Sequence, residues 1–171
     1  MTITQTGQII ALLKATYTSW KVEEGTIEAW HHFLSKFDFV DVMEAVDHFV
    51  GTSSSEYPPS VSQIIGTVVD IRVPIGPSPD QAWQNVLRAV GSEGYERIIK
   101  SNDSLNTLEW LAAHDIGWKE IAYTDERYRR PIEKDFKERY AEMVEQQRRE
   151  YASGAIPLPP KTDVLEITGG E

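Results

Sequence analysis

Apolar residues recur at intervals of three and four along most of the chain, the spacing of one face of an α-helix. In the first 72 residues, four such stripes follow one another, and each predicts a short amphipathic helix. The stripes are Ile9, Leu12, Leu13, Tyr17; Ile27, Trp30, Leu34, Phe37; Phe39, Val42, Met43, Val46, Val50; and Val61, Ile64, Ile65, Val68. No segment alternates long enough to predict a strand. We therefore expect an all-α fold that begins with four helices over about residues 5–72.

Polar residues mark two of these helix starts. Asp38 stands between two aromatic residues, where its side chain would cap the third helix. Ser60 directly follows Pro58 and Pro59 and precedes Gln63 by three positions, which is the spacing of a capping box.

Residues 73–79 predict a boundary. This stretch reads Val-Pro-Ile-Gly-Pro-Ser-Pro, and no helix crosses it, because proline lacks an amide donor and restricts the residue before it. We expect a short, stiff linker between a four-helix domain over residues 1–72 and a second helical domain over residues 80–152.

The second domain opens with a strong helix start. Ser78 is placed as a cap, Pro79 as the first helical residue and Gln81 as the third. The stripe Trp83, Val86, Leu87, Val90 follows, and Gly91 and Gly94 are expected to stop it. A further helix is expected to carry Leu105, Leu108 and Leu111 and to end near Gly117, before a short helix over residues 119–123.

The last predicted helix is long and charged. It begins near Pro131, ends near Ala152, and has the apolar stripe Ile132, Phe136, Tyr140 and Met143. Residues 153–171 after it are rich in proline and glycine and predict a flexible tail. The tail nevertheless keeps several apolar side chains, which are typical of a segment that docks onto something: Ile156, Leu158, Val164, Leu165 and Ile167.

Composition narrows the class of protein. The 171 residues are 40% hydrophobic and 26% charged, as in ordinary globular proteins. Cysteine is absent, which excludes disulfides, thiolate metal sites and cysteine nucleophiles. No apolar run reaches the ~20 residues that span a bilayer, and Met1–Gln5 lacks the order of a signal peptide, so we expect no membrane contact and a cytoplasmic location.

The net charge is −10 and is spread over the whole chain. Residues 1–77, 78–152 and 153–171 carry net charges of −5, −3 and −2 when counted separately. Because phosphate backbones are recognised through excess positive charge, this balance favours protein partners over nucleic acid.

Motifs for chemistry are missing. The sequence has no phosphate-binding G-x-x-x-x-G-K-S/T loop, no dinucleotide fingerprint and no nucleophile elbow, so we predict no cofactor, no catalytic residue and no enzyme activity. Glu28, His31 and His32 share one helical turn, and His48 is the nearest further metal ligand. A polar helix face beside Trp30 is the preferred interpretation of that cluster, and we predict no metal site.

The densest basic stretch runs from Arg127 to Arg139. Arginine interleaved with tyrosine is one pattern of nucleic-acid contact, but acidic residues alternate with the basic ones here. We therefore expect a helix face laced with salt bridges and weak or absent nucleic-acid contact. Trp20 and Trp118 lie at helix edges and are candidate anchors for a protein partner.

One motif resembles a known family. It is formed by Trp30, Leu34, Phe37-Asp38-Phe39, Val42-Met43 and the Pro58-Pro59-Ser60 turn. This pattern resembles the N-terminal domain of phage-encoded loader and inhibitor proteins of the DnaB-type replicative helicase, although that family has threonine where Ser60 stands. The second half is similar to the region after that domain in many small phage proteins, through Trp83, Gly117, Phe136 and Tyr140. Together, the resemblance covers about residues 8–150.

The resemblance implies a function. Such proteins are not enzymes; they bind a hexameric helicase, hold it inactive and deliver it to the phage origin through a phage initiator protein. It also implies that the C-terminal region contacts the helicase. The candidate partner-binding residues are Trp118, Arg129, Arg130, Lys134, Lys137, Arg139, Arg148, Ile156, Leu158 and Leu165. Two alternatives stay open: a DNA-binding replication initiator or regulator, and another phage–host protein-interaction module.

Overall fold

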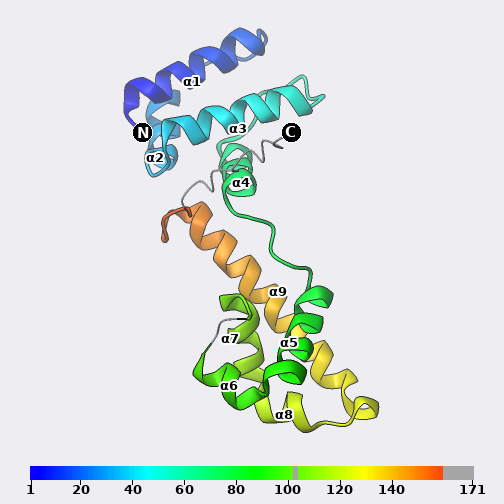
Figure 1. The fold of residues 1–171 in the computed structure, drawn as a ribbon. Helices are drawn as coiled ribbons and strands as arrows, with labels where there is room; N and C mark the ends of the chain where they lie inside the picture. The colour runs from blue at the N-terminus through cyan, green and yellow to red at the C-terminus, as the bar shows by residue number, and fades with distance from the viewer. Residues whose placement is uncertain (102–103, 160–171) are drawn as a thin grey trace, which may run out of the picture. The chain divides into compact units, whose positions relative to one another are not determined.

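The structure, a computed structural model, describes residues 1–101 and 104–159 (Figure 1). Within these ranges it contains nine α-helices, one 3₁₀ helix and no strand, so the prediction of an all-α fold is confirmed. The chain forms two compact units. The first consists of Met1–Pro74 together with the described residues from Glu150 to Pro159, and the second of Ile75–Arg149.

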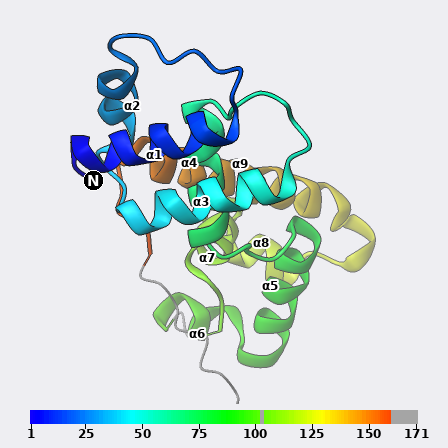
Figure 2. The same cartoon turned by 90° about the horizontal axis from the view of Figure 1, so that it is seen from above.

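The first unit is built on α1 (Ile3–Thr16), α2 (Thr26–Leu34), α3 (Phe39–Thr52) and α4 (Val61–Arg72). α3 packs against α4 and α1 against α2, and Figure 2 shows α1 beside α3. The apolar stripes predicted from the sequence meet in one core, except that Leu12 is 38% exposed and lies outside it. Its fully buried members include Ile9, Leu13, Leu34, Val42, Ala45, Val46, Ile64 and Val68.

The helix starts of this unit agree with the sequence in part. The capping box at Ser60 is confirmed: its amide donates to Gln63 Oε1 at 2.8 Å, and its Oγ accepts from the Gln63 amide at 3.3 Å. Asp38 does occupy the N-cap of α3, but the prediction that its side chain caps the helix is wrong. Its extended backbone is enough to begin the helix, because its carbonyl accepts from the Val42 amide at 3.1 Å.

The second unit contains α5 (Pro79–Glu93), α6 (Tyr95–Lys100), α7 (Thr107–Ile116), α8 (Trp118–Tyr123), the 3₁₀ helix η1 (Glu126–Tyr128) and most of α9 (Arg130–Ser153). Large aromatic side chains join α9 to α5. The ring centroids of Trp83 and Phe136 lie 5.3 Å apart, and Phe136 stacks on Tyr140 at 6.0 Å. The Tyr140 hydroxyl donates to the Pro77 carbonyl at 3.1 Å, so the start of the unit is attached to the same stack.

Local signals in the second unit are also confirmed in part. The Ser78 cap is present, since its Oγ accepts from the Gln81 amide at 3.2 Å and Pro79 is the first residue of α5. Gly91, however, lies inside α5, and the helix ends at Glu93. Gly94 (φ 77°) turns the chain there, because a positive φ is accessible to glycine at little cost. Leu105 is buried just before α7 instead of inside it, and the short helix α6 was not predicted.

The chain after α9 differs from the predicted flexible tail. Residues 154–159 lie against the first unit, where Leu158 packs on the core and the Pro159 carbonyl accepts a hydrogen bond from Arg72. These contacts join residues distant in sequence, so a composition rich in proline and glycine did not reveal them. The rest of the predicted tail lies outside the described residues.

Candidate protein-interaction surfaces

The histidine cluster of α2 serves the packing of the first unit. His31 Nδ1 shares a hydrogen bond of 3.1 Å with the hydroxyl of Thr6, which is fully buried on α1. His32 stands edge-on to Phe33 with ring centroids 4.9 Å apart. Over residues 1–101 and 104–159, no group of three or more histidine, cysteine or acidic side chains could hold a metal ion. No helix in the same ranges is both long and apolar enough to cross a membrane.

Three basic side chains on α9, Lys134, Lys137 and Arg139, form ion pairs with carboxylates. Lys137 is 27% exposed and forms ion pairs with Asp80 at 2.6 Å and with Glu133. These carboxylates, Asp80 above all, raise the pKa of Lys137 above its ordinary value. Arg139 likewise reaches Asp115 at 2.8 Å and Glu142 at 3.5 Å, and Asp115 dominates the upward shift of its pKa. The charge available to an outside phosphate is correspondingly reduced.

The N-terminal half of α9 also carries an open depression of about 430 Å³. It is lined by Arg130, Glu133, Lys134, Lys137 and Glu138, so it brings three of the sequence-predicted partner residues together. Lys134 pairs with Glu138 at 3.7 Å, and both are largely exposed. This surface has both signs of charge and is suited to a protein face of mixed charge.

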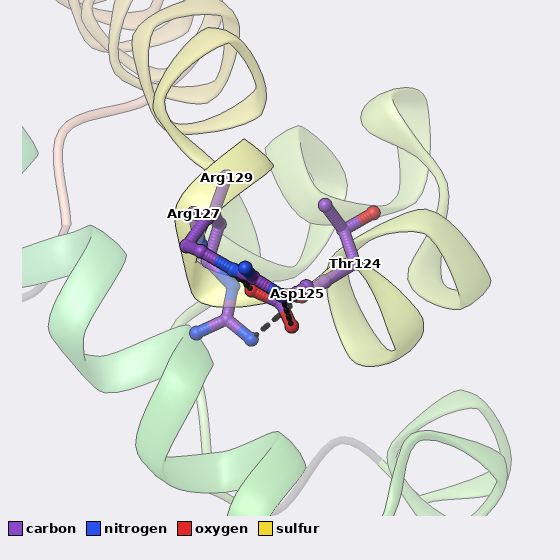
Figure 3. A network of polar contacts seen from close by, with 4 residues as sticks. All are labelled: Thr124, Asp125, Arg127 and Arg129. Atoms are coloured by element: carbon purple, nitrogen blue, oxygen red, sulfur yellow. Dashed lines mark hydrogen bonds and ion pairs between the residues drawn. The ribbon is translucent and has the colours of Figure 1, made fainter.

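Arg129 belongs to the turn that leads into α9 (Figure 3). Its Nη2 donates to the Thr124 carbonyl at 3.0 Å, and the guanidinium is therefore tied to the turn. Asp125 Oδ1 accepts from both the amide and Nε of Arg127, at 3.0 and 3.2 Å. The Arg127 side chain, followed by its amide, lowers the pKa of Asp125. The charged side chains of this turn therefore bind groups of the same turn. Tyr128, which follows Arg127, is 69% exposed.

A larger depression lies between α5, α6 and α8. Its volume is about 710 Å³, and its lining includes Glu93, Tyr95, Arg97, Lys100 and Tyr123. The rings of Tyr95 and Tyr123 meet edge to face at 5.6 Å, and hydrogen bonding to Tyr123 raises the pKa of Tyr95 to about 12. The sequence pattern did not indicate this region, because its walls come from three helices, one of which was missed.

The remaining candidates fall into different environments. Trp118 is only 4% exposed and lies in the core of the second unit, 6.2 Å from Trp110 between ring centroids. Arg148 is half-buried on α9. Ile156 is half-buried, and Leu158 packs against the core of the first unit. Leu165 lies outside the described residues.

The motif residues Trp30, Leu34, Phe37, Asp38 and Phe39 lead through one corner of the first unit, between α2 and α3. Trp30, Leu34 and Phe37 are buried, and the α2–α3 corner, residues 35–38, follows α2 directly. The Met1 amino group donates to the carbonyls of Ser35 and Phe37, each at 3.1 Å. Lys36 donates from Nζ to the Ser153 carbonyl at the end of α9. This corner therefore holds both the first residue of the chain and the end of α9.

The first unit is thus a small all-helical domain whose main features are a packed core and the α2–α3 corner. Residues 1–65 match the family model of the gp39P-type N-terminal domain, the N-terminal domain of a phage helicase loader and inhibitor. The match covers α1 to α3 and the first turn of α4, and it confirms the resemblance predicted from the motif. The role of that family is a non-catalytic, accessory one. No curated protein and no solved structure matches the chain.

Sequence reasoning missed two side chains that organise the first unit, Lys36 and Arg72. Arg72 forms an ion pair with Asp41, and the two side chains are 11% and 3% exposed. The sequence offered one signal for this ion pair. Asp41 lies in the first turn of α3 beside Val42, on the face that the structure shows to be buried. A carboxylate there requires a cationic or hydrogen-bonding partner.

Proposed function

We propose that this chain is a phage DNA-replication accessory protein that binds the DnaB-type hexameric helicase of a bacterial host. In this role it holds the helicase inactive, loads it at the origin, or does both. The match of residues 1–65 to the loader and inhibitor domain carries the proposal. The same proposal has three further parts. The resemblance extends over the second unit, the protein is located in the cytoplasm, and a phage initiator is a further partner.

Helicase contact is assigned to the C-terminal part of the chain. α9 offers a mixed-charge surface around Arg130 and Lys134, both exposed. A protein that binds one state of the helicase ring better than another shifts the ring toward that state, and the helicase itself supplies the ATP hydrolysis. Trp118 is left out of the proposed surface because a side chain 4% exposed offers a partner almost no area.

The direct test is complex formation with the purified host helicase. The two proteins are mixed at micromolar concentration, with and without ATP, and the mass of the complex is measured by size-exclusion chromatography with light scattering. We expect a stable complex whose amount depends on nucleotide. Absence of a complex in both conditions would refute the proposal.

Charge reversal then tests the surface. The double variant R130E/K134E changes two exposed α9 residues, and we expect at least a tenfold loss of helicase affinity, about 1.4 kcal/mol. The matched control K14E/K21E makes the same change of net charge at two exposed positions of the first unit. Equal loss in both double variants would indicate a general effect of charge and would contradict the assignment to α9.

The DNA-binding alternative makes an opposite prediction. If the chain were an initiator, the isolated protein would bind duplex or single-stranded DNA with an affinity that falls steeply with salt. The ion pairs of Lys137 and Arg139 argue against this. Salt-sensitive DNA binding by the unaltered chain, together with no detectable complex with the helicase, would favour the alternative.

A further inference from the structure

The segment Gly154–Pro159, here named the C-terminal strap, leaves α9 through a defined turn. Gly154 has φ 70°, in the left-handed region that favours glycine. The Ala155 amide donates to the Glu150 carbonyl at 2.9 Å and the Gly154 amide to the Tyr151 carbonyl at 3.0 Å. This is the hydrogen-bond pattern that ends many helices at a glycine and redirects the chain.

Lys36 of the α2–α3 corner fixes the beginning of the strap. Its side chain lies against Gly154, where a Cβ atom would stand 2.6 Å from Lys36 Cδ and 3.2 Å from Lys36 Cβ. Its Nζ donates to the Ser153 carbonyl. Residue 154 must therefore be glycine for two reasons: its backbone conformation and the closeness of the lysine stem.

Arg72 fixes the other end of the strap. Its Nη2 donates to the Pro159 carbonyl at 2.6 Å, while Nη1 pairs with the buried carboxylate of Asp41. The guanidinium has a rigid fork of donors, so one side chain can neutralise Asp41 and bind a main-chain carbonyl at once. Between the two ends, Leu158 packs against the core of the first unit.

The amino-acid composition of the strap favours binding to an apolar surface in an extended conformation. Pro157 and Pro159 have no amide donor to leave unpaired on an apolar surface, and each disfavours the helical conformation of the residue before it, which is thereby biased toward extended backbone. A segment already extended loses less entropy when it binds.

We propose that the first unit carries a binding site for an extended, proline-spaced apolar segment, and that the chain's own C-terminal strap occupies it. The site consists of the Lys36 stem, the Arg72–Asp41 pair and the apolar surface under Leu158. One consequence rests on the proposed function: a docked strap withholds Ile156 and Leu158 from the helicase. If the strap is docked nine-tenths of the time, its release raises helicase affinity about tenfold.

Docking is measured first without the helicase. Because the chain has no cysteine, a single one at exposed Ala155 (A155C) takes a spin label at one place, and electron paramagnetic resonance reports its mobility. We expect an immobilised label in the otherwise unchanged chain and a mobile one after Leu158→Asp. The matched control Ile75→Asp, at a position 93% exposed, should leave the label immobilised. A label that is mobile from the start, or unaffected by Leu158→Asp, would overturn the proposal.

Two further measurements test whether the strap docks within one chain: light scattering and the binding of a peptide. The labelled chain should be a monomer, since a dimer that depends on Leu158 would place the strap on a second copy and contradict docking within one chain. A fluorescent peptide of residues 154–159 should bind the full-length Leu158→Asp chain, whose site is vacated, more tightly than the parent chain, measured by anisotropy. Equal binding to both would count against the site.

Helicase affinity is measured last, with Gly154→Val. This variant disfavours the positive φ and meets Lys36, yet keeps Ile156 and Leu158 unchanged. We expect tighter helicase binding, and unchanged affinity would overturn the competition between strap and helicase. If no variant binds helicase while the label stays immobilised, the proposed function fails and the binding site stands.

Discussion

Each unit buries one carboxylate among its described residues, and the two are held by different kinds of donor. Asp41 of the first unit is 3% exposed and pairs with the guanidinium of Arg72. Glu109 of the second unit, also 3% exposed, accepts from the Asn85 side chain at 2.7 Å and from the Asn106 amide at 2.9 Å. Glu109 lies in the first turn of α7, where the helix dipole favours a negative charge.

The difference affects what each carboxylate is connected to. Glu109 is satisfied by two neutral groups of the second unit, the Asn106 amide at its own helix start and the Asn85 side chain on α5. Asp41 depends on a cation from α4, and that cation also binds the strap at Pro159. Neutral donors join Glu109 of α7 to α5 within the second unit, whereas the cation shared by Asp41 and Pro159 couples the core of the first unit to the end of the described chain.

The largest effect is expected where the second unit depends on aromatic packing. Phe136→Ala removes a fully buried ring that contacts both Trp83 and Tyr140, and we expect a loss of about 4 kcal/mol in the free energy of unfolding of this unit. Hydrogen exchange followed by mass spectrometry measures it, because peptides from α5 to α8 report on this unit separately. The control Phe33→Ala removes a ring that is 51% exposed and should change the exchange of α2 little. Comparable losses in both variants would refute the assigned core.

A smaller effect is expected from the ion pair of the first unit. Arg72→Ala leaves the Asp41 carboxylate buried without its guanidinium, and we expect a loss of about 3 kcal/mol, measured by hydrogen exchange of peptides from α3 and α4. The change should also mobilise the strap. Arg88→Ala, at an exposed position of α5, is the matched control and should be nearly neutral.

Glu109→Gln supplies the comparison with the second unit. Glutamine has one acceptor oxygen where the carboxylate has two, so one of the two hydrogen bonds is lost, at a cost of about 1–2 kcal/mol. This variant should leave the strap unchanged. Mobilisation of the strap by Glu109→Gln would contradict the separation between the two carboxylates.

The smallest effect concerns the pH dependence of the exposed turn before α9. The pKa of Asp125 is lowered, so its contribution to stability is present above the ordinary pKa of about 3.9 and is lost as the pH falls through the lowered folded value. Arg127→Ala should move the Asp125 titration upward, as measured by carboxyl carbon NMR. Arg130→Ala is the control and should leave it in place. A titration of Asp125 unchanged by Arg127→Ala would contradict the geometry of Figure 3.

The features that could be predicted from sequence are those set by near neighbours. The caps at Ser60 and Ser78 depend on residues three positions away, and both were predicted correctly. The apolar stripes likewise identified the buried faces of α1 to α4. α6 was missed because six residues between Gly94 and Ser101 are too few to show a periodic stripe.

The failures concern contacts between distant residues. Arg72 and Pro159 are 87 positions apart, and no local pattern links an arginine at a helix end to a backbone carbonyl there. The apolar residues of the tail did indicate a docking segment, but they did not identify its partner. The prediction that Gly91 ends its helix was wrong for a local reason. One glycine inside a helix costs only about 1 kcal/mol, and the helix continues through it.

The contact that Arg72 makes with the strap goes to a main-chain oxygen, and this has a consequence for how the segment can diverge. A carbonyl is present at every residue, so the guanidinium imposes no requirement on the side chain at position 159. Among related sequences we expect that position to vary freely wherever the backbone stays extended. Position 154 should remain glycine and position 158 should remain a large aliphatic residue, so the strap would be recognised in a distant relative by two residues and their spacing.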